Sequence, residues 1–294
     1  MPIRVAVVGA GSWGTTVAAL ACTNAPTVLW ARRAELADEV GSAHANHAYL
    51  PGFPLPEELS ATASLEEAVG AADVLVMGVP SHGMRSTLQE LAPHVRPWIP
   101  VVSLAKGLEE ASHLRMTEVI AQELPGHPVA ALTGPNLARE ILAGHAAAAV
   151  VATEDDHVAR ELQRIFSTEL FRVYTNHDVV GCEVAGALKN VVAIASGMAD
   201  GLGTGDNTRA AVITRGLAEL CRLGVAMGGE LPTFAGLAGM GDLVATCMST
   251  QSRNHHVGVE LGKGRAITEI IDEMNMVAEG VKSSRVVADL ADSL

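Results

Sequence analysis

The chain opens with Ile3-Arg4-Val5-Ala6-Val7-Val8-Gly9-Ala10-Gly11-Ser12-Trp13-Gly14. This stretch predicts an apolar strand, a glycine turn and the start of a helix. Gly9 permits the tight turn, Gly11 lets the backbone approach a pyrophosphate, and Gly14 lets the helix lie close to the sheet. The helix N-terminus then offers unpaired N–H groups to an anion. An ordinary glycine turn is the alternative, but a strand before and a helix plus second strand after it favour a dinucleotide site.

The residues after the predicted second strand indicate which dinucleotide is bound. Proteins that bind NAD usually have a carboxylate at this position, which holds the ribose 2′-hydroxyl. This chain instead reads Ala31-Arg32-Arg33. Two guanidiniums attract a 2′-phosphate and can stack on adenine, so we expect NADPH, with NAD as the second possibility. A merely solvated pair of arginines is the alternative.

Composition limits the classes of protein to which the chain can belong. Its 294 residues suggest about two domains. The net charge of −13, from 33 acidic and 20 basic residues, argues against nucleic-acid binding. No apolar run is long and uncharged enough to predict a membrane helix, and the histidine pairs at 44/47 and 255/256 predict no metal site.

The expected location is the cytoplasm. The first strand begins at Ile3, which leaves no room for a signal peptide. The four cysteines are widely spaced, without a C-x-x-C motif, as in proteins of reducing compartments.

Apolar strands and helices alternate through the first half of the chain. Buried strands are expected at residues 3–8, 27–30, 73–80, 99–105, 128–133, 146–153 and 170–175. This pattern predicts an α/β fold with a Rossmann-type, doubly wound, mostly parallel sheet, whose ligands bind beyond the carboxyl ends of the strands. From about residue 179 the strand signals disappear. We expect a dinucleotide-binding domain at 1–178 and an all-helical substrate domain at 179–294.

Three motifs in the helical half carry candidate chemistry. Lys189-Asn190 lies inside an apolar helix, so the ammonium needs a partner or a function unless it reaches solvent along the helix face. Several glycines precede Asp242, which we expect to cap the following helix, with a role in the site as a further possibility. Ser252-Arg253-Asn254 opens a helix with Ser252 as N-cap. That helix start could seat a phosphate or be a plain cap.

These motifs together resemble the bacterial glycerol-3-phosphate dehydrogenase [NAD(P)+] family. The resemblance runs in order through nearly the whole chain, over residues 9–15, 103–108, 132–138, 183–190, 236–242, 252–254 and 277–281. It implies reversible reduction of dihydroxyacetone phosphate to sn-glycerol 3-phosphate, which feeds glycerophospholipid synthesis. It also implies a cytoplasmic homodimer. Members usually continue with further C-terminal helices, whereas this sequence ends at Leu294, so the oligomer packing stays open.

The resemblance also implies the site residues. Cofactor contacts, including the glycines above, are Gly9, Gly11, Ser12, Trp13, Gly14, Arg32, Arg33, Lys106, Ala138, Arg253, Val277 and Glu279. Substrate contacts are Lys106, Gly134, Asn136, Lys189, Asp242, Ser252, Arg253 and Asn254. The catalytic group comprises Lys189, Lys106, Asn190 and Asp242, with Lys189 as the residue that transfers the proton.

Physical chemistry is compatible with these roles. Hydride attack at a C2 carbonyl places negative charge on its oxygen, which a nearby ammonium can stabilise and protonate. Asp242 would orient the amine of Lys189 beside the second ammonium at Lys106. Hydrogen bonds from Lys106 and Asn190 could fix the carbonyl.

Two other functions stay open at this point. A related NADP-dependent 3-hydroxyacid dehydrogenase shares the architecture and a Lys-Asn pair, but it needs a site for a carboxylate rather than a phosphate. A non-catalytic NADPH-binding sensor would keep the fold without the chemistry, although such a protein should have lost Lys189 or Lys106. Both lysines are present.

Overall fold

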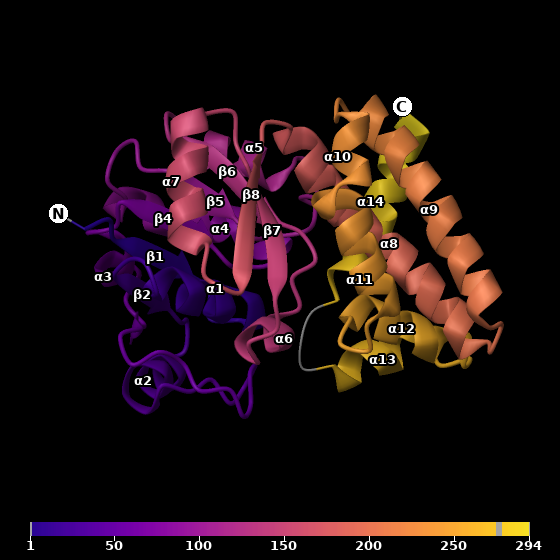
Figure 1. Ribbon diagram of the computed structural model, residues 1–294, viewed down its shortest axis with the longest axis horizontal. Coiled ribbons are helices and arrows are strands. Elements are labelled where there is room, and N and C mark those ends of the chain that lie inside the picture. Colours follow the sequence, from indigo (N-terminus) through magenta and orange to yellow (C-terminus); the bar gives the residue numbers. More distant parts are fainter. Residues whose placement is uncertain (1, 275–277, 294) are drawn as a thin grey trace. The chain divides into compact units, whose positions relative to one another are not determined.

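The computed structural model describes residues 2–274 and 278–293 (Figure 1). Its backbone divides into two compact units. Unit 1 comprises Met1–Ala105, Met116–Leu132 and Asn136–His177, and unit 2 comprises Lys106–Arg115, Thr133–Pro135 and Asp178–Leu294. Two short segments from the first half of the chain therefore group with the helical half.

Unit 1 is built on a sheet that, in the described residues, has eight strands in the order β3-β2-β1-β4-β5-β6-β7-β8. The pairs β1–β2, β1–β4, β2–β3, β4–β5, β5–β6 and β7–β8 are parallel. The strands are β1 (Val5–Val8), β2 (Thr27–Trp30), β3 (Ser60–Thr62), β4 (Val74–Met77), β5 (Val101–Ser103), β6 (Val129–Thr133), β7 (Ala147–Ala152) and β8 (Phe171–Asn176). The strand order changes direction at β1 and β4, where doubly wound sheets bind ligands.

Helices cover the sheet because its central strands are apolar on both faces. All four residues of β1 and of β4 are buried. Val5 and Val7 share a core with residues of α1, α2, α6 and α7, whereas Ala6 and Val8 point to the other face. The helices are α1 (Ser12–Cys22), α2 (Ala34–Ala43), α3 (Leu65–Val69), α4 (Ser81–Leu91), α5 (Met116–Glu123), α6 (Ala138–Leu142) and α7 (Asp156–Phe166), with a 3-10 turn η1 (Ala92–His94) after α4.

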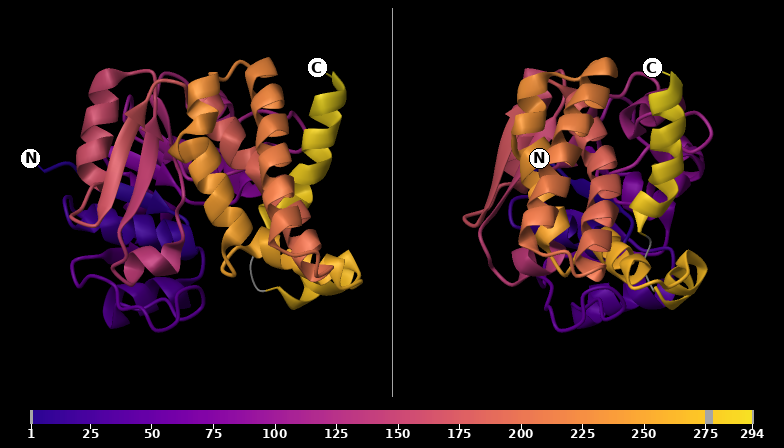
Figure 2. Two further views of the ribbon diagram at one scale, coloured as in Figure 1. Left: turned by 45° about the vertical axis from the view of Figure 1, so that its right-hand side comes forward. Right: turned by 90° about the vertical axis from the view of Figure 1, so that its right-hand side faces the viewer.

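Unit 2 is organised around one long helix, α8 (Val179–Gly201), which contacts most of the other helices (Figure 2). These are α9 (Asp206–Ala226), α10 (Leu231–Ala235), the π-helix η2 (Leu237–Gly241), α11 (Asp242–Met248), α12 (Arg253–Gly262), α13 (Ile267–Glu273) and α14 (Glu279–Ser293). Helices α8 and α12 approach to backbone contact, because a Cβ on Gly197 would lie 2.1 Å from the His255 carbonyl oxygen.

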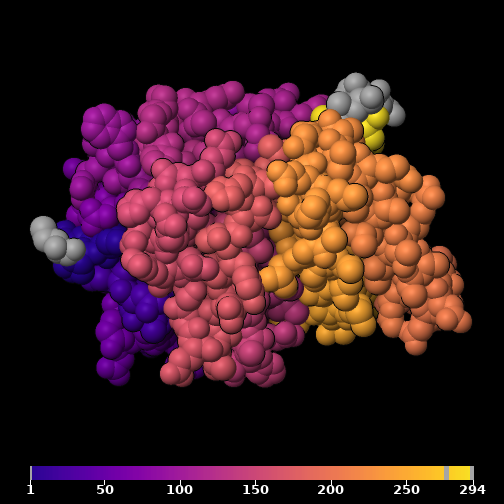
Figure 3. Space-filling view, turned by 45° about the horizontal axis from the view of Figure 1, so that its top comes forward, coloured from indigo at the N-terminus to yellow at the C-terminus, as the bar shows by residue number. Residues whose placement is uncertain are grey.

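The central helix and its neighbour α9 differ in exposure. Among described residues, α8 is long and apolar enough to cross a membrane, which corrects the expectation that no apolar run in the sequence is. However, 72% of its most apolar window is buried inside the structure. Protein side chains therefore cover it, as in a core helix. In contrast, α9 buries only Leu220 and Gly224 and forms part of the outer surface of unit 2 (Figure 3).

The Rossmann-type fold followed by helices is confirmed, and β2 has the predicted bounds. The sequence did not predict the short elements β3, η1, α10 and η2. Short elements leave little periodicity in a sequence, which explains these omissions.

Candidate active site

The glycine turn between β1 and α1 has the geometry that its sequence predicts. Gly9 has a φ of 119°, in the region that favours glycine. A Cβ on Gly14 would lie 2.0 Å from the Gly9 carbonyl oxygen, so only glycine fits there. A Cβ on Gly11 would meet no atom within 4 Å, and no side chain caps the α1 N-terminus. Packing therefore leaves no room for a side chain at Gly9 and Gly14, whereas the space beside Gly11 is free for an anion.

Two of the predicted site residues in unit 1 bury polar atoms that have no partner in the described structure. These atoms are Nε1 of Trp13 and both amide atoms of Asn136. The Trp13 ring is fixed by packing, with its centroid 6.4 Å from that of Phe171. Buried polar groups are rarely left unsatisfied, so these atoms fit hydrogen bonds to a bound ligand.

The two arginines expected to select NADPH follow β2 directly. Arg32 and Arg33 are exposed, and no hydrogen bond or ion pair to another described residue engages either guanidinium. Ala138 is half-buried and begins α6. The residues of unit 1 thus fit a dinucleotide with an additional phosphate, whereas Val277 lies outside the described residues.

In unit 2, two lysines meet one carboxylate. Nζ of Lys106 lies 2.7 Å from Oδ2 of Asp242, and Nζ of Lys189 lies 3.0 Å from Oδ1 of the same side chain. Nζ of Lys106 also donates to the Gly134 carbonyl oxygen at 2.7 Å. Lys189 is 4% exposed and Asp242 is 2% exposed. Lys189 therefore does not reach solvent along the helix face, and its charge is balanced inside the fold.

Asp242 does not cap a helix, which corrects the sequence-based expectation. Gly241 is the N-cap residue of α11, and Asp242 is the first residue inside that helix. The π-helix runs directly into α11, so Asp242 lies inside a helical run, and its carboxylate pairs with the two lysines. Such helices often occur at functional sites.

Thr246 completes this group and was missed from the sequence. Nζ of Lys189 donates to Oγ1 of Thr246 at 2.7 Å, and this hydroxyl donates to the Asp242 carbonyl oxygen at 2.6 Å. Thr246 follows Asp242 by four residues, which places both on one face of α11. That spacing was the only sequence signal available, and it is too common to identify a site.

The pKa of Lys106 is lowered to about 8. Burial disfavours the ammonium and is the largest cause, and the nearby Lys189 acts in the same direction. The carboxylates of Asp242 and Glu279 oppose the shift. Lys106 therefore changes charge close to neutral pH, as residues at functional sites often do.

Two asparagine side chains connect Lys106 with helices α12 and α14. The Gly280 N–H donates to Oδ1 of Asn254 at 3.0 Å, which leaves the Asn254 amide nitrogen to donate to Oδ1 of Asn190 at 2.9 Å. Nδ2 of Asn190 then donates to the Lys106 carbonyl oxygen at 2.9 Å. Each bond fixes the orientation of the next amide. Asn190 therefore holds the backbone beside Lys106.

The start of α12 is built as predicted. Oγ of Ser252 caps the helix by accepting a hydrogen bond from the His255 N–H at 3.2 Å. Ser252 and Asn254 are both buried. Arg253 is exposed, although nearby protein atoms partly desolvate its guanidinium and lower its pKa, a shift that Glu279 opposes. A guanidinium at a capped helix start is suited to hold a phosphate.

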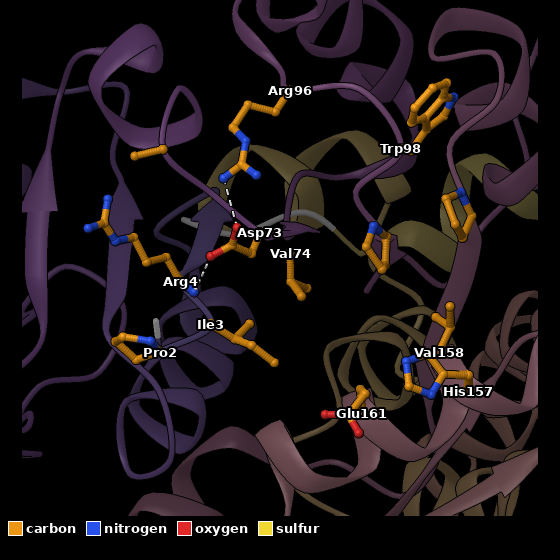
Figure 4. A pocket seen from close by; sticks show the side chains of 13 residues that line it. Pro2, Ile3, Arg4, Asp73, Val74, Arg96, Trp98, His157, Val158 and Glu161 are labelled. Atoms are coloured by element: carbon orange, nitrogen blue, oxygen red, sulfur yellow. Dashed lines mark hydrogen bonds and ion pairs between the residues drawn. The ribbon is translucent and has the colours of Figure 1, made fainter.

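A pocket of about 530 Å³ in unit 1 is not this site (Figure 4). Its lining precedes β1, β4, β5 and β6 and includes the start of α7, whereas the glycine turn follows β1. The pocket and the turn therefore lie at opposite ends of these parallel strands. Nη1 of Arg96 donates to Oδ1 of Asp73 at 2.7 Å there, so these two charges compensate each other. Doubly wound sheets bind ligands at the carboxyl ends.

Family models match almost the whole chain. Residues 4–159 match the N-terminal model of NAD-dependent glycerol-3-phosphate dehydrogenase, and residues 178–294 match the C-terminal model. The first matched segment contains the glycine turn and Lys106, and the second contains Lys189 and Asp242. Residues 160–177 lie between the two matches.

Individual proteins give the same result. The chain is 63% identical over 292 residues to glycerol-3-phosphate dehydrogenase [NAD(P)+] 2 of Sphingopyxis alaskensis, covering 99% of this chain and 88% of that protein. It is 55% identical over 290 residues to the corresponding Mycobacterium avium protein, covering 98% and 85%. The crystal structure of glycerol-3-phosphate dehydrogenase from Coxiella burnetii has a TM-score of 0.94 at 37% identity, covering 99% and 90% of the two chains.

Proposed function

Because the chain belongs to the NAD-dependent glycerol-3-phosphate dehydrogenase family, we propose a residue-level account of how it interconverts dihydroxyacetone phosphate and sn-glycerol 3-phosphate. The enzyme is an NAD(P)-dependent oxidoreductase. Its product supplies glycerophospholipid synthesis. Neither a 3-hydroxyacid dehydrogenase nor a sensor is favoured by the family match.

The spare hydrogen-bond donors of the two lysines carry the proposal. An ammonium has three N–H bonds. Lys106 donates to Gly134 and Asp242, and Lys189 donates to Thr246 and forms an ion pair with Asp242. Within the described residues, one N–H of each ammonium remains for a substrate oxygen. Two such donors can stabilise the negative charge that develops on the C2 oxygen during reduction.

The proton and electron balance assigns the roles further. Bound NAD(P)H supplies the hydride that C2 of dihydroxyacetone phosphate accepts. The C2 oxygen then takes a proton from Lys189, which a solvent proton later restores. Asp242 and Thr246 orient the Lys189 ammonium, because the Asp242 carboxylate forms an ion pair with it and Oγ1 of Thr246 accepts its hydrogen bond. The reverse reaction uses Lys189 as the base.

The remaining predicted residues position the substrate. We assign the phosphate group to Ser252, Arg253 and Asn254 at the start of α12, where a guanidinium lies beside the helix N–H groups. Gly134 and Asn136 are assigned to the three-carbon chain. Holding the phosphate fixes C2 for hydride attack, which accounts for much of the rate gain in such reactions.

Unit 1 is assigned to the cofactor. We propose that Gly9, Gly11, Ser12, Trp13 and Gly14 hold the pyrophosphate side. Arg32 and Arg33 are assigned to the 2′-phosphate of NADPH, and Ala138, Lys106, Arg253, Val277 and Glu279 complete the set. The open space at Gly11 and the unpartnered Nε1 of Trp13 support this assignment.

The division of labour follows two domains, at 1–178 for the cofactor and 179–294 for the substrate. The segments Lys106–Arg115 and Thr133–Pro135 group with the second of these in space. We further propose a cytoplasmic homodimer formed through the helical unit. Four free cysteines and the exposed Leu202 and Leu231 support this proposal.

Loss of NADPH absorbance on addition of dihydroxyacetone phosphate is the direct test. We expect oxidation with NADPH, slower oxidation with NADH, and none with the oxo forms of 3-hydroxy acids. Turnover of an oxo acid in place of dihydroxyacetone phosphate would assign the enzyme to the related dehydrogenases. NADPH binding without any oxidation would assign it as a sensor.

A further inference from the structure

Glu183 is a buried carboxylate on α8 that no step of the proposed reaction uses. Its side chain is 6% exposed, and Oε2 accepts a hydrogen bond from Nη1 of Arg115 at 2.8 Å. Removing two charges from water is costly unless their geometry is good, so this pair constrains the structure around it. Arg115 ends the segment Lys106–Arg115, which begins with an active-site lysine.

The face of α8 that carries Glu183 makes two further contacts with this segment. Positions 183, 187 and 190 lie along one side of the helix, because seven residues complete nearly two turns. Nδ2 of Asn190 donates to the Lys106 carbonyl oxygen, and Ala187 packs against Leu108. Together with the ion pair, these contacts hold the segment near its beginning and at its end.

The segment is also closed on itself. Leu108 and Arg115 form an antiparallel bridge, and the Glu109 N–H donates to a backbone carbonyl across the loop at 2.9 Å. His113, with a φ of 59°, makes the reversal between the two sides. A closed loop of this kind transmits displacement from one side to the other. Holding Arg115 therefore restrains the backbone beside Lys106.

We propose that Glu183 is a positioning residue for Lys106. Its ion pair with Arg115 seats the closed segment on α8 and keeps the Lys106 ammonium in reach of Gly134 and Asp242. Glu183 and Arg115 touch neither substrate nor cofactor in this arrangement. The inference rests on the proposed function, since it concerns the same site.

A chemical test of this role does not depend on turnover. In the intact protein, acylation of each lysine by an N-hydroxysuccinimide ester is followed by peptide mass spectrometry. The Lys106 side chain is 15% exposed and should react slowly, whereas Lys263 at 55% provides an exposed reference. We expect Glu183→Ala to accelerate acylation of Lys106 several-fold relative to Lys263. An unchanged ratio in the folded variant would overturn the inference.

Glu183→Gln is a second variant that keeps the test decisive if Glu183→Ala does not fold. An amide oxygen can still accept from Arg115, so the seat of the segment should be largely kept although the negative charge is gone. We expect acylation of Lys106 to return close to the parent rate. Equal effects of glutamine and alanine would show that only charge balance matters, which contradicts a positioning role.

Kinetics supply the second readout. In Glu183→Ala, we expect kcat to fall about tenfold to a hundredfold, because small misplacement of a catalytic group is costly. KM for NADPH should stay unchanged.

Lys282→Met is the matched control. Lys282 pairs with Glu110 on the same segment at 3.5 Å, but both side chains are about half exposed. An exposed pair of this kind contributes little, so rates, pH profile and acylation should match the parent. Changes as large as those in Glu183→Ala would mean that any disturbance of the segment suffices, and the inference would fail.

The outcomes separate this inference from the proposed function. A parent protein that does not oxidise NAD(P)H with dihydroxyacetone phosphate contradicts the proposed function, while the acylation ratio still decides the role of Glu183. An active parent with an unaffected Glu183→Ala variant contradicts the inference alone.

Discussion

The glycine turn of unit 1 and the lysine cluster of unit 2 are built in different ways. The turn is made by neighbouring residues, Gly9 to Gly14, and its properties come from backbone geometry. The cluster brings Lys106 to Asp242, 136 positions away in the chain, and its properties come from buried charge. We therefore expect the local backbone geometry of the turn to govern cofactor binding, and the buried charges of the cluster to govern turnover.

The largest expected effect separates turnover from binding. Lys189→Ala removes the proposed proton donor and one of two donors to the C2 oxygen, so kcat should fall by about 100-fold to 10,000-fold. The dissociation constant of NADPH, measured by fluorescence titration, should stay close to that of the parent. Lys263→Ala, at an exposed position, is the control. Retained turnover in the first variant would remove Lys189 from the mechanism.

A matched pair of glycine substitutions tests the local backbone geometry of the turn. Gly14→Ala places a Cβ 2.0 Å from the Gly9 carbonyl oxygen, so the free energy of unfolding should fall by about 1–3 kcal/mol or more. Gly11→Ala adds a methyl group to open space and should leave the melting temperature unchanged. It should nevertheless weaken NADPH binding about tenfold, because the backbone can no longer approach the phosphates. Parent-like NADPH affinity in Gly11→Ala would contradict that approach.

The two arginines after β2 sharpen the comparison by acting on one part of the cofactor. Arg32→Ser/Arg33→Ser should raise KM for NADPH about tenfold, since charge-assisted bonds to the 2′-phosphate are lost. KM for NADH should change little. Parallel initial-rate measurements with the two cofactors decide the point. Equal changes for both cofactors would show that the arginines do not select the phosphate.

The smallest expected effect is a pH dependence of turnover. Because the pKa of Lys106 is about 8, its ammonium is lost as pH rises through that value, and kcat for reduction should decline above it. Lys106→Met should lack this limb. A parent profile that stays flat from pH 7 to about 9.5, well past that pKa, would contradict the assignment.

Through Lys106, rising pH should increase the stability of the fold, whereas it should decrease turnover. The folded pKa of Lys106 lies below its ordinary value of 10.5, so burial of the ammonium destabilises the fold fully below about pH 8. That penalty is relieved as pH rises from 8 toward 10.5. Thermal unfolding of the parent and of Lys106→Met across this range measures it, and a constant difference between the two would contradict the shift.

The sequence predicted the fold more completely than the site. Repeated apolar strands and one glycine motif were sufficient for unit 1, and the bounds of β2 were predicted correctly. The prediction that Asp242 caps a helix was wrong, because the π-helix before α11 places Asp242 inside a continuous helical run. Thr246 was missed, since a threonine four residues after an aspartate is a common arrangement.

By itself, the sequence determined the glycine turn, the order of strands and helices, and the presence of lysines in apolar surroundings. These features depend on residues close together in the chain. Only the tertiary structure decided that Lys106 and Lys189 share one carboxylate, that Asn190 holds the backbone beside Lys106, and that Glu183 pairs with Arg115. Side-chain charges of distant residues interact strongly only after folding removes the water between them.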